Sequence, residues 1–385
     1  MSPSLLQNAW GQPPWQIDFS PAQQPLPDKV DFAIIGGGFT GLAAAAWLRL
    51  HAPDKSVAVL EAGRIGAGAS GRTGGMVLAE SAAGDLPGLG DVRAGLTHIL
   101  EDLGRACGIS LIENCELALP GAWEIARKGG LAESPISWND SGILRVVNEV
   151  PGGTVHPGKL VEGLARAAER LGAVLIEHVR VERVDWGADA KLVFAGGNLR
   201  ARKVLFATNG LSLGLSGLND RAHPRLTLAA STAPLDEEEL DAIGLSQRKP
   251  FYTVDFPYLW GRVCRDNSIV WGAGLVSAEP WGSVEQIDIA AEESSRMFAA
   301  LERRIRRLRP GLEKLDFTHR WGGPILFRDG WEPVFDRHPA SESGVVLGAF
   351  AGHGVALSVY LGTWAAEIMR GRRNLPEWGR ITESK

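Results

Sequence analysis

The chain has 385 residues, of which 45% are hydrophobic and 22% are charged, with a formal net charge of −5. This composition is typical of a globular protein large enough for two domains, and it argues against nucleic acid as the main partner. Cys107, Cys115 and Cys264 are too few and too scattered for a disulfide framework or a zinc site, so we expect no metal. The sequence shows neither a signal-peptide pattern nor an apolar run of the roughly 20 residues that span a bilayer, so we expect a cytoplasmic protein without a membrane span.

The first 28 residues are rich in proline and glutamine and include Trp10 and Trp15. A segment of this composition has no periodic pattern that would predict a helix or a strand. We expect an irregular arm over residues 1–28 that lies on the surface, with its tryptophans as anchors.

A glycine turn follows the apolar run 30–35. Gly36, Gly38 and Gly41 stand at the G-x-G-x-x-G spacing, and residues 42–50 after them are predicted to be a helix. In this motif the glycines allow a tight turn, a close backbone approach to a pyrophosphate and close packing of helix on strand. The helix N-terminus adds unpaired N–H groups and a partial positive charge, so the stretch predicts a dinucleotide site.

The predicted strand 57–60 ends at Glu61, about twenty residues beyond the last motif glycine, where a carboxylate binds a ribose hydroxyl in such sites. The alternative is an ordinary βαβ unit with Glu61 on the surface. Residues 62–76 are rich in glycine and alanine, with Ser70, Arg72 and Thr73 as hydrogen-bond donors. Small residues let the backbone pass close to a flat ligand, whereas a flexible surface loop would explain only the glycines.

The turn GGGFTG, the strand end E-A-G-R and the loop G-A-S-G-R-T-G-G together resemble the D-amino-acid oxidase-like family of FAD-dependent oxidoreductases. Within this family the chain resembles the glycine and sarcosine oxidases. Its loop motif is most similar to that of the γ-glutamylputrescine oxidases. The resemblance implies an α/β fold with a Rossmann-like FAD-binding domain of the glutathione-reductase type and an α+β substrate domain with a mostly antiparallel sheet. The FAD-binding domain would comprise residues 29–83, 154–215 and 320–385, and the substrate domain residues 84–153 and 216–319.

Several periodic stretches follow the loop. Residues 92–104 carry apolar side chains at helical spacing, and we assign them to the substrate domain. Residues 159–171 are predicted to be an amphipathic helix, and residues 173–176 a strand that returns to the nucleotide sheet. His156 precedes a proline, a position more typical of a structural residue than of a catalytic one.

Residues 226–281 alternate between polar and apolar and contain many aromatics, which predicts an antiparallel sheet. By resemblance, this sheet covers the substrate pocket. Arg262 and Arg265 either bind a substrate carboxylate through a bidentate fork or lie solvated at the sheet edge. Residues 287–308 predict a long amphipathic helix whose basic end is a solvated face rather than an anion site.

The segment W-x-G at 321–323 is similar to one in the family, in which an arginine often follows and binds the substrate carboxylate. Here Pro324 and Ile325 follow and Arg328 is offset, which favours a substituted amine over an α-amino acid. Sarcosine oxidases attach their flavin through a cysteine in this region. This chain has no cysteine from position 265 onward, so the resemblance implies FAD that is bound non-covalently.

A second glycine turn, Gly352-His353-Gly354, follows the apolar run 345–350 and precedes a predicted helix over 356–369. A helix N-terminus here would stabilise negative charge on a reduced flavin. His353 either contacts flavin or substrate, or is a structural residue satisfied by the backbone.

By resemblance, three groups of residues form the site. Those expected to bind FAD come from the two glycine turns, the small-residue loop and four other segments, namely Gly36, Gly38, Phe39, Thr40, Gly41, Glu61, Ala62, Arg64, Ala69, Ser70, Gly71, Arg72, Thr73, Gly74, Gly75, Met76, Val181, Ala207, Thr208, Asn209, Gly210, Gly323, Gly352, His353, Gly354 and Val355. Arg72 and His353 are also the expected catalytic residues. The aromatic residues expected to contact the substrate are Tyr258, Trp260, Trp271, Trp321 and Phe327.

The resemblance implies oxidation of a C–N bond in a small-molecule amine or amino acid. A hydride passes to flavin N5, the resulting imine hydrolyses, and oxygen reoxidises the flavin with formation of hydrogen peroxide. Two alternatives stay open: a dehydrogenase that uses a quinone or protein acceptor, and a flavin-binding module without turnover.

Overall fold

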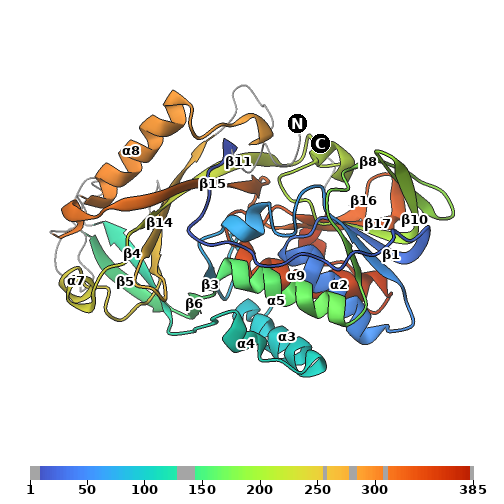
Figure 1. The fold of residues 1–385 in the computed structure, drawn as a ribbon, viewed down its shortest axis with the longest axis horizontal. Helices are drawn as coiled ribbons and strands as arrows, with labels where there is room; N and C mark the ends of the chain where they lie inside the picture. Colours follow the sequence, from blue (N-terminus) through green and yellow to red (C-terminus); the bar gives the residue numbers. More distant parts are fainter. Residues whose placement is uncertain (1–8, 128–143, 255–257, 277–283, 307–310, 382–385) are drawn as a thin grey trace.

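Two large sheets organise the molecule (Figure 1). The computed structural model describes residues 9–127, 144–254, 258–276, 284–306 and 311–381. The first sheet has the order β16-β17-β10-β1-β2-β7, and β9 and β8 continue from β10. Its strands are β1 (Lys29–Ile35), β2 (Val57–Leu60), β7 (Val174–Ile176), β8 (Val181–Asp185), β9 (Ala190–Phe194), β10 (Gly197–Phe206), β16 (Val334–His338) and β17 (Ser341–Gly348).

The centre of the first sheet is parallel. β1 lies between β10 and β2, which pair further with β17 and β7, all in parallel. Strands covered on both faces need continuous apolar runs, and all four residues of β2 are buried. The arrangement confirms the Rossmann-like sheet expected from the sequence.

Helices α2 (Phe39–His51), α5 (Pro157–Arg170) and α9 (Gly354–Met369) pack on this sheet in one core. α2 is apolar along nearly its whole length, because it is buried between β1 and the other two helices. His156 is the N-cap of α5, and its Nδ1 accepts a hydrogen bond from the backbone N–H of Lys159 at 3.2 Å. His156 is therefore a structural residue.

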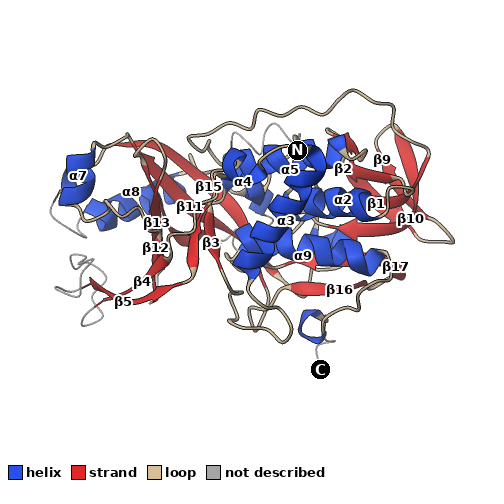
Figure 2. Ribbon diagram, turned by 90° about the horizontal axis from the view of Figure 1, so that it is seen from below, coloured by secondary structure: helices blue, strands red, loops and turns tan. Residues whose placement is uncertain are grey.

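The prediction that residues 84–153 belong to the substrate domain is wrong for their first part. Helices α3 (Val92–Cys107) and α4 (Leu111–Asn114) bury their apolar faces in the core formed by α2, α5 and α9. Figure 2 shows α3 and α4 beside these helices, away from the strands at the other end of the molecule. An apolar helix face specifies burial but not the partner that covers it, so the sequence could not place α3.

The second sheet has the order β15-β11-β14-β13-β12-β4-β5. Its strands are β4 (Ala122–Arg127), β5 (Leu144–Val150), β11 (His223–Thr232), β12 (Phe251–Thr253), β13 (Leu259–Val263), β14 (Ile269–Val276) and β15 (Phe317–Phe327). Every pairing is antiparallel except that of β12 with β4, which confirms a mostly antiparallel sheet. Because β15 belongs to this sheet, residues 320–327 are not part of the first domain, contrary to the expected boundary.

Two helices cover one face of the second sheet, α7 (Glu237–Ala242) and α8 (Glu292–Arg306). The helix expected over 287–308 begins five residues later than predicted, and its last two predicted positions, 307 and 308, lie outside the described residues. The remaining short elements are β3 (Met76–Leu78), β6 (Gly152–Thr154), α6 (Leu213–Ser216) and the 3-10 turns η1 (Ala69–Arg72), η2 (Val284–Gln286), η3 (Leu312–Lys314) and η4 (Glu377–Gly379).

Within the described ranges, no helix has the length and apolar character needed to cross a bilayer. The same residues contain no group of three or more His, Cys, Asp or Glu side chains placed to hold a metal ion.

The contact between α2 and α9 depends on Gly362. A Cβ atom at this position would lie 2.7 Å from the carbonyl oxygen of Thr40, a backbone atom that cannot swing aside. We expect Gly362→Ala to lower the free energy of unfolding by about 1–3 kcal/mol through overpacking. Thermal melts measure the change, and the exposed Gly187→Ala is the control. Equal melting temperatures for the two variants would contradict this packing constraint.

Candidate functional site

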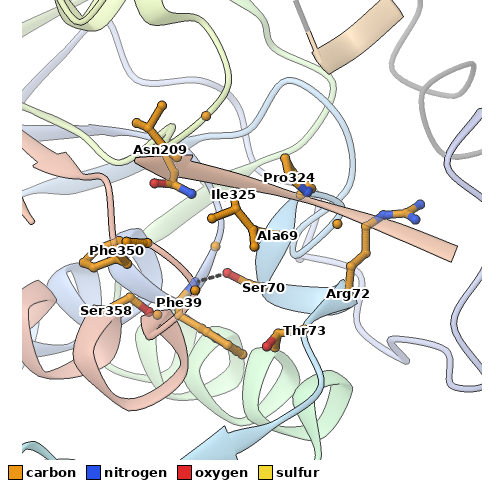
Figure 3. A pocket seen from close by; sticks show the side chains of 18 of the residues that line it. Phe39, Ala69, Ser70, Arg72, Thr73, Asn209, Pro324, Ile325, Phe350 and Ser358 are labelled. Carbon is orange, nitrogen blue, oxygen red and sulfur yellow. Dashed lines mark hydrogen bonds between the residues drawn. The ribbon is translucent and has the colours of Figure 1, made fainter. Parts of the chain in front are cut away.

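A cavity of about 990 Å³ opens where the two sheets meet. Its wall combines the first glycine turn, the loop 67–74, the end of β10, the start of α9 and one face of the second sheet. Figure 3 shows that side chains from these separated segments lie around one space. Residues that are distant in sequence therefore form a single site.

The glycine turn brings the start of α2 to the cavity. Gly36 has φ +111°, and a Cβ there would lie 2.6 Å from the carbonyl oxygen of Ala207. A Cβ at Gly38 would lie 2.7 Å from Ser70 Oγ. Phe39 donates its backbone N–H to the same Ser70 Oγ at 2.9 Å (Figure 3). Thus the turn and the loop meet at the cavity wall, and Thr40 lines it as well.

Gly41 does not line the cavity. A Cβ there would lie 2.0 Å from the carbonyl oxygen of Gly36, so this glycine allows the helix to approach the strand. Its expected contact with FAD is replaced by a packing role, which is the third function that the motif assigns to its glycines.

Glu61 stands at the end of β2 and faces the cavity, as the motif predicts. Its Oε2 accepts a hydrogen bond from the N–H of Gly37 at 2.8 Å, and its Oε1 one from Gly63 at 2.7 Å. Burial raises the pKa of the Glu61 carboxyl. The carboxylate is not an exposed surface group, which removes the alternative of a plain βαβ unit.

The loop after Glu61 lines the cavity with part of its length. Ala62, Ala69, Ser70, Thr73, Gly74 and Met76 line it, as expected. Arg64 does not, because its side chain is exposed. Gly71 and Gly75 do not line the cavity either. Both pack against the backbone: a Cβ at Gly71 would lie 2.4 Å from the carbonyl oxygen of Gly66, and a Cβ at Gly75 would lie 2.2 Å from the carbonyl oxygen of Val155.

Arg72 is at the cavity wall, but its side chain extends away from the other labelled side chains in Figure 3. Its Nη1 donates to the carbonyl oxygens of Gly11 at 2.8 Å, Gly322 at 3.2 Å and Trp10 at 3.3 Å. Only 5% of the residue is exposed, and burial lowers the pKa of Arg72 to about 10. A guanidinium held by the chain itself does not fit the catalytic role that the resemblance implied.

The end of β10 and the start of α9 line the cavity beside the first glycine turn. Ala207, Thr208, Asn209, Gly210, Gly323, Gly352, His353, Gly354 and Val355 all line the cavity, and Val181 joins them from β8. Asn209, at φ +48°, accepts a hydrogen bond from the N–H of Ala349 at 3.0 Å. The Oγ1 of Thr208 and the Nδ1 of His353 are buried with no protein partner among the described residues. Burial lowers the pKa of His353, which keeps the ring neutral near pH 7.

Four of the five predicted aromatic residues line the cavity, namely Tyr258, Trp260, Trp321 and Phe327. Trp271 does not. It pairs with Gly261 across the sheet while Trp260 pairs with Gly272, so the alternation of side chains puts Trp271 on the opposite face. There it is fully buried against Phe251.

Sequence reasoning missed several polar lining residues, including Glu80, Glu124 and Tyr252. Tyr252 donates its hydroxyl to Glu124 Oε1 at 2.7 Å, and burial together with this bond raises the pKa of Tyr252. The two residues are neighbours because β12 pairs with β4 in parallel. A pairing between strands about 130 residues apart leaves no local signal in the sequence.

The arginines considered for a substrate carboxylate point elsewhere. Arg262 donates through Nε to the carbonyl of Gly74. Arg265 is exposed and lies 3.4 Å from Glu116. Arg328 donates to the carbonyls of Trp378 and Arg380. None of the three lines the cavity, whereas Pro324 and Ile325 do.

These observations fit FAD. Glycines that can carry no side chain stand at one wall, and two helices direct their N-termini at the cavity. A carboxylate occupies the ribose position of the motif, and two buried polar atoms of the lining residues Thr208 and His353 have no protein partner among the described residues. The cavity extends from there to an aromatic sheet face, as a long, partly flat ligand requires.

Comparisons with known proteins agree. A family model described as "FAD dependent oxidoreductase" (DAO) matches residues 31–368. The chain is 27% identical over 389 residues to "Probable oxidoreductase OrdL" of Rhizobium meliloti (strain 1021). It is 26% identical over 387 residues to "Gamma-glutamylputrescine oxidoreductase" of Escherichia coli (strain K12). Each alignment covers 89% of this chain and 84% of the relative.

Solved structures show the same fold. Glycine oxidase from Geobacillus kaustophilus superimposes with a TM-score of 0.73 at 20% identity, over 93% of this chain and 100% of that one. L-proline dehydrogenase from P. horikoshii gives a TM-score of 0.68 at 17% identity, over 92% of this chain and 97% of that one. Because the family match includes both glycine turns that line the cavity, the chain belongs to the FAD-dependent oxidoreductase family, and its cofactor is FAD.

Proposed function

We propose that the protein oxidises a C–N bond of a small-molecule amine. The observation that carries this proposal is the continuity of the cavity, which runs from the nucleotide turn to an aromatic face of the second sheet. The relative from Escherichia coli is named as an oxidoreductase of gamma-glutamylputrescine, and the glycine oxidase fold is shared. When bound, FAD would supply a hydride acceptor, from which oxygen would take up the electrons.

Different residues of the cavity wall suit the different parts of FAD. Gly36, Gly38 and the start of α2 suit the pyrophosphate, and Glu61 suits the ribose hydroxyls. Val181 suits the adenine. The segment from Ser70 to Met76 and the start of α9 remain for the flavin ring. Among the described lining residues there is no cysteine, in keeping with non-covalent binding.

The substrate end of the cavity favours an amine without a neighbouring carboxylate. Glu80 and Glu124 line this part of the cavity, the lining residue Arg180 pairs with Glu285, and the candidate arginines donate elsewhere. A substrate carboxylate would face these negative charges, which disfavour it. An ammonium group, in contrast, can donate to the carboxylate of Glu124 beside aromatic walls.

Anaerobic titration tests the function. We expect a primary or secondary alkylamine to bleach the visible flavin absorption, and its α-carboxylated counterpart to bleach it far less. Peroxide formed when air is readmitted measures the use of oxygen as acceptor. Equal bleaching by both members of the pair would contradict the preference for amines, and bleaching by neither would contradict the function.

The placement of the nucleotide turn is tested by Gly38→Glu. A side chain here collides with Ser70 and brings a negative charge to the pyrophosphate position, so we expect the variant to lose FAD. The flavin retained after desalting is measured by absorbance. The matched control is Gly187→Glu, at an exposed position. If the Gly38 variant kept its flavin, the placement would be wrong.

Glu124→Gln tests the amine pocket. Removing the carboxylate charge replaces a charge-assisted hydrogen bond by a neutral one, and we expect KM for the amine to rise about tenfold with a smaller change in kcat. Steady-state kinetics separate the two constants. Glu149→Gln, an exposed residue of β5 that pairs with Lys249, serves as the control. An unchanged KM in the Glu124 variant would count against substrate binding at this carboxylate.

A further inference from the structure

We propose that residues 9–15 are a positioning element for FAD, here called the N-terminal clasp. The clasp and Arg72 fix the loop 66–75, which forms the wall on which the flavin ring is placed. The inference rests on the proposed position of that ring, and it assigns to an arm outside the nucleotide-binding motif an indirect part in cofactor binding, through the loop.

The clasp extends the second sheet at its edge. Gly11 forms an antiparallel bridge with Trp321 of β15, and Gly322 donates its N–H to the carbonyl of Trp10 at 2.7 Å. Trp10 is 2% exposed, lines the cavity and donates its Nε1–H to the carbonyl of Val284 at 3.2 Å. The clasp is therefore fixed to the substrate-side sheet before it reaches the loop.

Arg72 forms hydrogen bonds with the clasp, with β15 and with the loop. Its Nη1 donates to two clasp carbonyls, those of Trp10 and Gly11, and to that of Gly322 in β15. Its Nε lies 3.3 Å from the carbonyl of Ala67 in the loop. Burying a guanidinium is costly, and the convergence of carbonyl oxygens from three segments offsets that cost only while all three stay in place.

Two tryptophans hold consecutive carbonyls of the loop. Trp15 of the clasp donates its Nε1–H to the carbonyl of Gly71 at 2.8 Å, and Trp321 donates to that of Arg72 at 2.8 Å. The two rings also meet edge to face, with centroids 5.6 Å apart. The loop is thus held by directed hydrogen bonds from both the arm and the sheet.

The arm leaves no room for side chains at the loop glycines. Ile17, just beyond the clasp, lies so close that a Cβ at Gly66 would stand 2.7 Å from its Cδ1 and one at Gly71 would stand 2.8 Å from it. On its other side the loop is attached to the nucleotide turn, through Gly66 N–H to the carbonyl of Gly37 at 2.9 Å. A shift of the arm would therefore move the cavity wall.

Trp15→Phe tests one contact of the clasp, because it keeps an aromatic ring, though a smaller one, and removes the N–H donor. We expect this variant to weaken FAD binding about fivefold, the effect of one hydrogen bond, and to shift the visible bands of the bound flavin. The matched control is Trp47→Phe, which removes a hydrogen bond to Glu367 on α9 away from the loop. Titration of the apoprotein with FAD gives Kd, and thermal melts of both apoproteins show whether the fold is equally retained.

Arg72→Met removes the common donor, and Arg72→Lys restores the charge with fewer donors. We expect the methionine variant to lose at least about tenfold in FAD affinity and the lysine variant to lose less. If Trp15→Phe and Arg72→Met both bound FAD with the Kd and spectrum of the unchanged protein, the clasp would have no positioning role. If the unchanged apoprotein bound no FAD, the cofactor site itself would be overturned together with the clasp.

Discussion

The rest of the structure depends on the close approach of α2 to the end of β1. Gly41 lies so near the carbonyl of Gly36 that no side chain fits between them, and Gly362 of α9 also packs closely on Thr40. These backbone contacts set where the two helices begin relative to the sheet. Since both helix N-termini line the cavity, the same constraint that packs the core also directs their partial positive charges at the ligand.

Three arginines near the cavity join segments of the chain that are distant in sequence. Arg72, Arg262 and Arg328 each donate to backbone carbonyls of segments more than 45 residues away along the chain. A planar guanidinium with several donors suits this task better than lysine. Under the proposed function, the carboxylates of Glu80 and Glu124 then set the charge of the substrate end, which is the basis for proposing an amine over an amino acid.

The sequence predicted those features that local patterns encode. The β1–α2–β2 unit, Glu61 and the turn before α9 follow from glycine spacing and apolar runs within some thirty residues. Contacts between distant segments had no such signal, which is why α3 was assigned to the wrong domain. The prediction that Trp271 contacts the substrate was wrong for a related reason. A shift of one residue along a strand moves a side chain to the other face of the sheet, and the register was not readable from the sequence.

The two ends of the cavity place different demands on an amine. Near α9, burial lowers the pKa of His353, and the same desolvation favours the neutral form of a bound amine. Near β4 and β12, Glu124 and its partner Tyr252 favour a cation. Under the proposed function, an amine would enter as the ammonium form preferred in water and reach a region that favours loss of its proton. Only a neutral amine can give up a hydride from the adjacent carbon. The change from a region with carboxylates to a desolvated region therefore suits the proposed oxidation without a dedicated catalytic base.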